Sequence, residues 1–271
     1  MPELPEVETT LRGIAPHIEG QIIQQVVVRQ PKLRWPVPDN LADTLADLTV
    51  KSVNRRAKYL LFKTDAGTLL LHLGMSGSLR VLQEAKIPDT HDHVDFIFAN
   101  GVLLRYNDPR RFGSILWTTQ PPEQHVLLKD LGPEPLSPGF DGNHLYQASK
   151  SRKTPVKSLI MDSHVVVGVG NIYANEALFM AGINPARYAG KISLACYRVL
   201  ADCIQSVLQN AIQQGGTTLR NFVNESGKPG YFKQQLLVYG RGDSPCRRCL
   251  TPLKEIRINN RSTVFCSHCQ K

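Results

Sequence analysis

The sequence lacks a long apolar run, because none of its stretches approaches the roughly 18 consecutive apolar residues that a membrane helix needs. Its first residues, MPELPEVETT, are acidic, whereas a secretory signal peptide begins with basic residues and continues with an apolar stretch. Cys196 and Cys203 are seven residues apart in an expected helix, about 10.5 Å along its axis, which is too far for a disulfide. We therefore expect an intracellular, cytoplasmic protein without a membrane span.

Acidic residues are also in deficit, since 23 Asp and Glu accompany 32 Lys and Arg, and the net charge is +9. Such an excess favours a polyanionic partner, either nucleic acid or an anionic membrane surface, and charge alone does not choose between them. With 42% hydrophobic and 20% charged residues, the composition is that of a globular protein with a sizeable core. A length of 271 residues favours two packed domains.

The first half of the sequence is dominated by strand patterns. Apolar residues recur at helical spacing from Pro5 to Ile14, which predicts a short N-terminal helix. Strands are then expected at residues 21–30, 58–64, 67–73, 77–82, 94–99 and 102–106, with a tight hairpin turn at Asn100-Gly101. Because no long helices alternate with these segments, an antiparallel sandwich is favoured over a parallel sheet.

The proline-rich segment 119–141 indicates a boundary between two domains. Beyond it, helical patterns cover residues 154–162, 171–182 and 193–214, and short strands return near the last cysteines. Segregation of the strands from the helices predicts an α+β fold.

The strongest local signal is a pair of C-x2-C motifs, Cys246 with Cys249 and Cys266 with Cys269, separated by sixteen residues. This spacing is typical of four thiolates around one tetrahedral zinc ion, and it leaves no open coordination position. We therefore expect one structural Zn²⁺ in a finger whose basic side chains reach phosphates.

The N-terminus offers a second signal, because removal of Met1 would leave Pro2 with a secondary amine. An α-amino group has a reference pKa near 8, about two units below that of lysine, so more of it is neutral and able to attack an aldehyde carbon. Glu3 and Glu6 lie nearby in the sequence for proton transfer. The same residues also suit an ordinary helix start, so this segment alone leaves both interpretations open.

Two loops have patterns that suit contact with nucleic acid. Residues 165–170 read VVVGVG before Asn171, which favours backbone amides aimed at a phosphate, although glycines that pack at a helix start give the same pattern. A dinucleotide-binding loop would need glycine where Tyr173 stands. Residues 108–113, DPRRFG, join cations to an aromatic ring, which suits either insertion into a base stack or a surface turn anchored by Phe112.

Ten motifs in one order resemble bacterial formamidopyrimidine-DNA glycosylases from end to end: MPELPEVET, RRAKYLL, HLGMSG, HDHVDF, NDPRRFG, GVGNIYANE, QGGTT, GKPGYF, VYGR and the four-cysteine finger. The resemblance implies a two-layered β-sandwich with flanking helices at residues 1–130. It implies a helix-two-turn-helix domain at 131–235 and a zinc-finger hairpin at 236–271. It also implies a repair enzyme that flips oxidised purines, such as 8-oxoguanine, out of duplex DNA. We expect a monomer without a nucleotide cofactor.

The resemblance further implies roles for single residues. Pro2 attacks C1′ of the lesion sugar and Glu3 protonates the opening ring. Lys58 is the proton donor in β-elimination, and Arg261 plays the corresponding part in δ-elimination. The residues that fill the emptied base stack are Met75, Arg110 and Phe112, with Arg110 facing the orphaned cytosine. The expected contacts with the DNA backbone are His72, His91, Arg152, Lys157 and Asn171, with Lys153 as an alternative to Arg152. Glu6 and Glu176 resemble supports of the catalytic amine, and residues 215–232 resemble a loop that covers the flipped base.

Leu250 departs from the family pattern, which commonly has glycine after the second cysteine, so we expect backbone strain there. Ser163 replaces an amide residue and puts no catalytic role in doubt. Two other functions stay open. One is a relative that prefers oxidised pyrimidines, against which the PELPE start and the RRF segment argue. The other is a zinc protein that only binds damaged DNA, against which Pro2, Glu3 and Lys58 argue.

Overall fold

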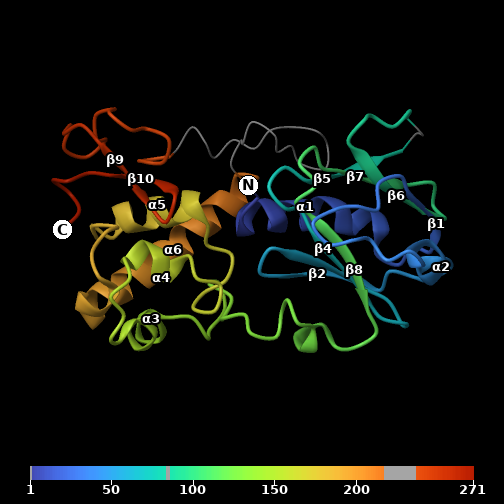
Figure 1. Cartoon of the computed structure of the whole chain (residues 1–271), viewed down its shortest axis with the longest axis horizontal. Coiled ribbons are helices and arrows are strands. Elements are labelled where there is room, and N and C mark those ends of the chain that lie inside the picture. Colours follow the sequence, from blue (N-terminus) through green and yellow to red (C-terminus); the bar gives the residue numbers. More distant parts are fainter. Residues whose placement is uncertain (1, 84–85, 217–235) are drawn as a thin grey trace. The chain divides into compact units, whose positions relative to one another are not determined.

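Every strand pair in this computed structural model, which describes residues 2–83, 86–216 and 236–271, is antiparallel (Figure 1). The chain divides into two units. The first contains Met1–Lys129 together with Gln214–Tyr231 as far as these residues are described, and the second contains Asp130–Gln213 and Phe232–Lys271. The division of the chain into three domains stays a prediction.

The first unit is the predicted sandwich of two four-stranded sheets, in the orders β1-β6-β7-β5 and β2-β3-β4-β8. Its elements are α1 (Leu4–Ile18), β1 (Ile23–Val28), α2 (Leu41–Leu45), β2 (Ser52–Arg56), β3 (Tyr59–Lys63), β4 (Thr68–His72), β5 (Ser78–Leu82), β6 (Asp92–Phe98), β7 (Leu103–Asn107), β8 (Ser114–Thr118) and the short 3₁₀ helix η1 (Pro122–Gln124). Asn100-Gly101 joins β6 to β7, as the hairpin pattern predicts, and Gly101 has φ +84°.

The core of the sandwich explains why these segments form strands. Buried apolar side chains from both sheets, such as Leu71 and Phe96, join one cluster with Val7, Ile14 and Ile18 of α1. The helix therefore continues past the predicted end at Ile14, because its apolar face extends to Ile18, which is fully buried.

Two loops, which we call the sheet-joining loops, connect the sheets at one end of the sandwich. Residues 73–77 run from β4 to β5, and residues 108–113 run from β7 to β8. The strand ends that they leave and enter are paired, His72 with Ser114 in one sheet and Ser78 with Asn107 in the other. Strand register therefore brings the loops together, although they are some thirty residues apart in the sequence.

The second unit is helical and ends in a hairpin. Its elements are α3 (Gly142–Ser149), α4 (Val156–Ile160), α5 (Asn171–Met180), the 3₁₀ helix η2 (Ala189–Lys191), α6 (Leu194–Gln213), β9 (Lys254–Ile258) and β10 (Arg261–Phe265). Helix α5 is buried on almost every side, because it contacts α4, α6 and β10. The fold class is therefore α+β, as predicted. Among the described residues, no helix combines the length and apolar character needed to cross a bilayer.

Candidate functional site

The N-terminus is fixed by a capping box at the start of α1. The Glu6 carboxylate accepts a hydrogen bond from the Glu3 N–H at 2.8 Å, and the Glu3 side chain accepts one from the Glu6 N–H. Glu3 and Glu6 are 1% and 0% exposed, and Pro2 is also buried. These bonds hold the backbone directly after Pro2 in one conformation, and the role of Glu6 as a support of the catalytic amine stays a prediction.

The loop that is expected to cover a flipped base begins beside this capping box. Gly216 has φ +81°, and a Cβ atom there would lie 3.2 Å from a carboxylate oxygen of Glu6. A larger residue at this position would therefore crowd Glu6 as well as strain the backbone. Residues 217–232 of the expected loop lie outside the described residues.

Lys58 occupies the tight turn between β2 and β3, where its charge acts on the ring of His72. His72, at the end of β4, stacks on Tyr59 with ring centroids 4.8 Å apart. Burial, followed by the charges of Lys58 and Arg34, lowers the pKa of His72 to about 4. Its Nδ1 accepts a hydrogen bond from the Gly74 N–H at 2.9 Å, so Nε2 carries the proton and remains a donor. A neutral donor of this kind suits a phosphate oxygen.

The sheet-joining loops carry Met75, Arg110 and Phe112 to the surface. Met75 and Phe112 are 37% and 44% exposed, which is unusual for large apolar side chains. The Arg110 guanidinium carbon lies 4.8 Å from the centre of the Phe112 ring. Met75 and Phe112 line a hollow of about 350 Å³ with Gly74, His72 and Arg34. The structure thus groups four predicted site residues, Met75, Arg110, Phe112 and His72, and it adds Arg34, which the sequence did not single out.

His91 is exposed directly before β6, and its carbonyl oxygen accepts a hydrogen bond from the Asp108 N–H at 3.0 Å. This bond attaches the His91 backbone to the second sheet-joining loop. Arg152, in the other unit, is also exposed and lies 3.4 Å from the Asp162 carboxylate. Lys153 beside it is exposed too, so burial does not decide between the two cations.

Lys157 and Asn171 hold the β9–β10 hairpin, a role that the sequence did not reveal. Lys157 is only 1% exposed, and its ammonium donates to the Ser262 carbonyl at 2.8 Å and to the Thr263 hydroxyl at 2.7 Å. The Asn171 amide, in the first turn of α5, donates to the same Ser262 carbonyl at 3.1 Å. Their contact with DNA stays a prediction, and for Lys157 it requires access to an ammonium group that is buried in this structure.

Arg261 is exposed at the start of β10 and lines a polar hollow of about 300 Å³ together with Lys157, Ser158 and Asn259. This hollow brings two predicted site residues of the second unit together. Its walls supply the exposed guanidinium of Arg261, which suits an anionic group, and also the carboxylate of Asp162, which does not.

Glu176 organises the chain segment that leads to the cysteines. Its two carboxylate oxygens accept hydrogen bonds from the N–H groups of Leu237, Val238 and Tyr239 at 2.7–2.9 Å. Burial raises the pKa of Glu176, while these three donors act in the opposite direction. Within this unit, Glu176 therefore serves as a backbone clamp.

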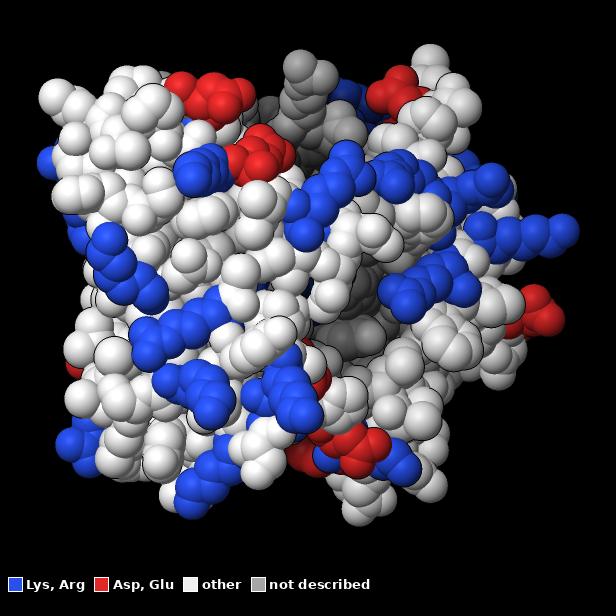
Figure 2. Space-filling view, turned by 60° about the vertical axis from the view of Figure 1, so that its left-hand side comes forward, with Lys and Arg blue, Asp and Glu red and all other residues white. Residues whose placement is uncertain are grey.

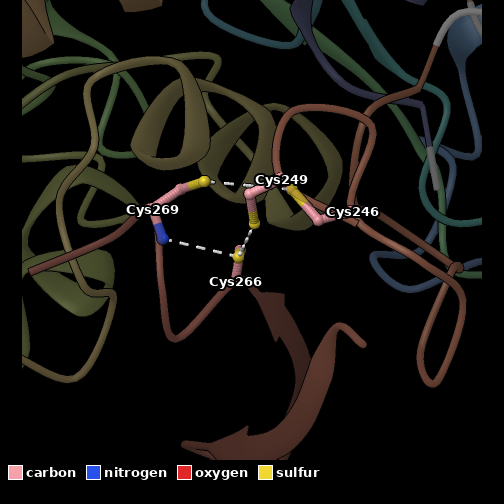
Figure 3. A group of neighbouring side chains, drawn as sticks. All are labelled: Cys246, Cys249, Cys266 and Cys269. Carbon is pink, nitrogen blue, oxygen red and sulfur yellow. Dashed lines mark hydrogen bonds between the residues drawn. The ribbon is translucent and has the colours of Figure 1, made fainter. Parts of the chain in front are cut away.

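The four cysteines form a compact ligand set at the base of the hairpin (Figure 3). Their sulfur atoms all lie within 4.8 Å of one another, and tetrahedral zinc with bonds of about 2.3 Å would space its sulfur ligands by about 3.8 Å. Backbone N–H groups of Arg248 and Cys269 each lie 3.4 Å from a cysteine sulfur, as is favourable for thiolates. The donor set therefore fits a structural zinc ion.

The first C-x2-C turn with the residue after it, 246–250, which we call the first knuckle, carries the backbone strain that the sequence predicts. Leu250 has φ +64°, a region that side chains with a Cβ atom disfavour, and it is 75% exposed. Arg248 of the same knuckle donates to the carbonyl of Phe179 at 3.3 Å and stacks on its ring, so the finger caps the end of α5. This cap was not predicted.

Basic side chains are more widespread than acidic ones on one face of the molecule. On the face shown in Figure 2, Lys and Arg side chains are widespread, whereas Asp and Glu side chains form a few small groups. This distribution suits a polyanion that follows the surface through many weak phosphate contacts.

Three family models match successive parts of the chain. Residues 1–115 match the formamidopyrimidine-DNA glycosylase N-terminal domain, residues 131–223 match the H2TH domain of the same family, and residues 243–271 match the zinc finger found in FPG and IleRS. A formamidopyrimidine-DNA glycosylase of Marinobacter nauticus is 61% identical, with all of both chains covered.

Solved structures are similar over the same length. The MutM (Fpg) protein of Thermus thermophilus is 37% identical and has a TM-score of 0.89, with 99% of this chain and 98% of that one covered. Wild-type Fpg of Lactococcus lactis, in complex with DNA that contains N7-benzyl-Fapy-dG, is 32% identical and has a TM-score of 0.92, with both chains fully covered.

Proposed function

The chain belongs to the formamidopyrimidine-DNA glycosylase family, and we propose that it removes oxidised purines from duplex DNA and then cleaves the abasic site. The observation that carries this proposal is the buried N-terminus, where the capping box of Glu3 and Glu6 fixes the backbone that follows Pro2. A nucleophile needs such a fixed position in order to meet one sugar carbon repeatedly.

Base removal uses the Pro2 nitrogen after loss of Met1. The amine forms a bond to C1′ of the lesion nucleotide and gives up its N–H proton, the bond from C1′ to the base nitrogen breaks, and the base leaves with a proton on that nitrogen. The Glu3 carboxyl group donates a proton to the ring oxygen as the sugar opens, and C1′ becomes an iminium carbon bonded to Pro2. The capping box supports this role, because the bond that the Glu3 side chain accepts from the Glu6 N–H fixes the position of its carboxyl group.

Strand cleavage follows from the iminium ion, which makes a proton on C2′ acidic. Loss of this proton expels the 3′ phosphate by β-elimination, and a second elimination expels the 5′ phosphate. In this proposal Lys58 is the proton donor in β-elimination, and Arg261 plays the corresponding part in δ-elimination. Neither step adds water across a phosphate bond, so a hydrolytic metal ion is not required.

Lesion recognition uses the sheet-joining loops. Met75 and Phe112 fill the emptied stack, and the Arg110 fork donates to the acceptor edge of the orphaned cytosine. His72, His91, Arg152, Lys157 and Asn171 contact the DNA backbone in this proposal. The neutral Nε2–H donor of His72 supports its part in this contact.

The zinc ion, held by Cys246, Cys249, Cys266 and Cys269, supplies a structural cross-link. We further propose that the protein acts as a monomer on cytoplasmic DNA, since one lesion is an asymmetric target. The three domains in this proposal are residues 1–130, 131–235 and 236–271. The first family-model match ends at residue 115 and the second begins at residue 131, which supports a domain boundary between these two positions.

A panel of lesion duplexes tests the function. We expect faster cleavage of duplexes with 8-oxoguanine opposite cytosine than of duplexes with thymine glycol, and products that carry phosphate at both ends of the gap. Pro2→Gly is expected to lose normal strand cleavage and to retain lesion binding, measured by gel shift. Faster cleavage at thymine glycol would reassign the substrate, and unchanged cleavage by Pro2→Gly would exclude the proline mechanism.

A further inference from the structure

One buried carboxylate, that of Asp108, connects the two sheet-joining loops. Asp108 is 0% exposed, and one of its oxygens accepts a hydrogen bond from the Ser76 hydroxyl at 2.7 Å. Its other oxygen accepts one from the Tyr106 hydroxyl at 3.1 Å and one from the Gly113 N–H at 2.9 Å. Ser76 is on the first loop and Gly113 on the second, so the carboxylate lies between them.

The backbone of Arg110 is tied into the same group of bonds. Its N–H points to the Ser76 hydroxyl oxygen at 3.2 Å and to the Asp108 carboxylate at 3.3 Å. Ser76 directly follows Met75 in the first sheet-joining loop. Its hydroxyl group is bonded both to Asp108 and to Arg110. The buried carboxylate of Asp108 is therefore bonded to Arg110 itself and to the residue next to Met75, and both of these residues have exposed side chains.

The loops also touch through their backbones, which leaves little room for independent movement. A Cβ atom on Gly74 would lie 2.4 Å from the Gly113 nitrogen and 2.4 Å from the Phe112 carbonyl carbon. A Cβ atom on Gly113 would lie 1.9 Å from the Tyr106 hydroxyl oxygen. Loss of the carboxylate would consequently leave buried donors in a tightly packed place, where an unpaired donor is costly.

We propose that Asp108 is a positioning residue that sets the spacing of Met75, Arg110 and Phe112, and thereby the discrimination of the base opposite the lesion. It acts through the loops and touches no DNA. The inference rests on the proposed function, because it assumes that these three side chains enter the base stack. Discrimination depends on spacing because the Arg110 fork meets the acceptors of cytosine only from one position.

The test compares Asp108→Asn with Asp95→Asn. An amide keeps the size of the carboxylate but has only one accepting oxygen, so in either orientation the NH₂ group faces the donors of one carboxylate oxygen, those of Tyr106 and Gly113 or those of Ser76 and Arg110. Asp95 is a matched control, because it is also a buried carboxylate of the first unit and accepts two bonds of 2.8 Å from Arg105, away from both loops. Single-turnover excision of 8-oxoguanine is measured opposite cytosine and opposite adenine, with cleavage of a preformed abasic site measured in parallel.

For Asp108→Asn we expect excision opposite cytosine to fall by about 10- to 100-fold, which is the size expected for lost bonds to a buried charge. The ratio of the cytosine and adenine rates should fall at least about 3-fold, and abasic-site cleavage should change less than excision. For Asp95→Asn the melting temperature should drop while this ratio stays at the wild-type value.

An equal loss on every substrate, with the rate ratio unchanged in folded Asp108→Asn, would overturn the inference. If that variant does not fold, Ser76→Ala replaces it, because it removes the hydroxyl that joins the first loop to Asp108 and Arg110 and leaves Tyr106, Gly113 and the Arg110 N–H bonded to the carboxylate. A wild-type rate ratio in Ser76→Ala would then overturn the inference. Failure of the wild-type protein to excise 8-oxoguanine would instead contradict the proposed function, so the two failures are distinguishable.

Discussion

The sheet-joining loops and the zinc finger both present exposed side chains, yet they are held in different ways. In the loops, one buried carboxylate accepts bonds from residues brought together by strand register, with Ser76 and Asp108 separated by 32 positions. In the finger, four cysteines in two short motifs are arranged for one metal ion. A metal ion therefore fixes a loop through ligands that are close together in the sequence. The hydrogen bonds of the sheet-joining loops instead need partners that the folded sheets bring together.

Removal of zinc should break the second region and leave the first one folded. We expect Cys266→Ser, or treatment with a strong chelator, to unfold the finger and to weaken DNA binding by at least about 100-fold, since structural zinc contributes about 10 kcal/mol or more to folding of such sites. Zinc content by mass spectrometry and affinity by fluorescence anisotropy measure both effects. Unchanged affinity of the metal-free protein would contradict the structural role of the ion.

Glu176→Gln should weaken the same region less severely. The amide retains one acceptor atom for the three N–H groups of residues 237–239, so we expect a loss of roughly 3–5 kcal/mol in the free energy of unfolding. Chemical denaturation measures this loss. The exposed Glu123 provides the control, and Glu123→Gln should unfold like the wild type. Equal stability of both variants would show that the clamp contributes nothing.

His72 gives the first region a pH dependence. The folded chain keeps His72 neutral down to pH about 4, whereas the unfolded chain binds a proton below about pH 6.5. The unfolded state therefore gains protons first, and stability falls by about 3 kcal/mol as the pH drops from 6.5 to 4. His72→Gln should lose this contribution, which is the difference between the two denaturation series. Parallel series for the two proteins would contradict the lowered pKa.

Leu250→Gly should have the smallest effect, and it should stabilise the finger. Glycine relieves the strain of φ +64°, and little burial is lost because Leu250 is mostly exposed, so we expect a gain of about 0.5–1 kcal/mol. Asn259 has φ +47° and is of a residue type that tolerates this conformation, so Asn259→Gly should gain less. A loss of stability in Leu250→Gly would show that the leucine side chain packs favourably.

Local patterns predicted most of the fold, but they did not predict β2, α2, β8 and α3. The segment of β2, SVNRR, is largely polar, and α3 begins at a glycine after a proline-rich stretch. Both form because they pack against neighbours, β2 along β3 and α3 against α6.

The candidate site divides in the same way. The cysteine spacing and the Pro2-Glu3 start are visible in the sequence, because their chemistry is local. The roles of Asp108 and Lys157 are not, since Asp108 needs Ser76 and Lys157 needs a hairpin more than 100 positions away. The cations and the aromatic ring of the DPRRFG segment predicted a loop that contacts nucleic acid. The partners that hold this loop become visible only from the register of β4 with β8 and of β5 with β7.

Borohydride trapping tests most directly whether Pro2 is the covalent nucleophile. The purified protein, with its N-terminal residue verified by mass spectrometry, is incubated with a duplex containing 8-oxoguanine opposite cytosine and is then reduced. We expect a covalent adduct whose mass maps to the nitrogen of Pro2. An adduct on a lysine such as Lys58, or no adduct from protein with Pro2 as its first residue, would contradict this expectation.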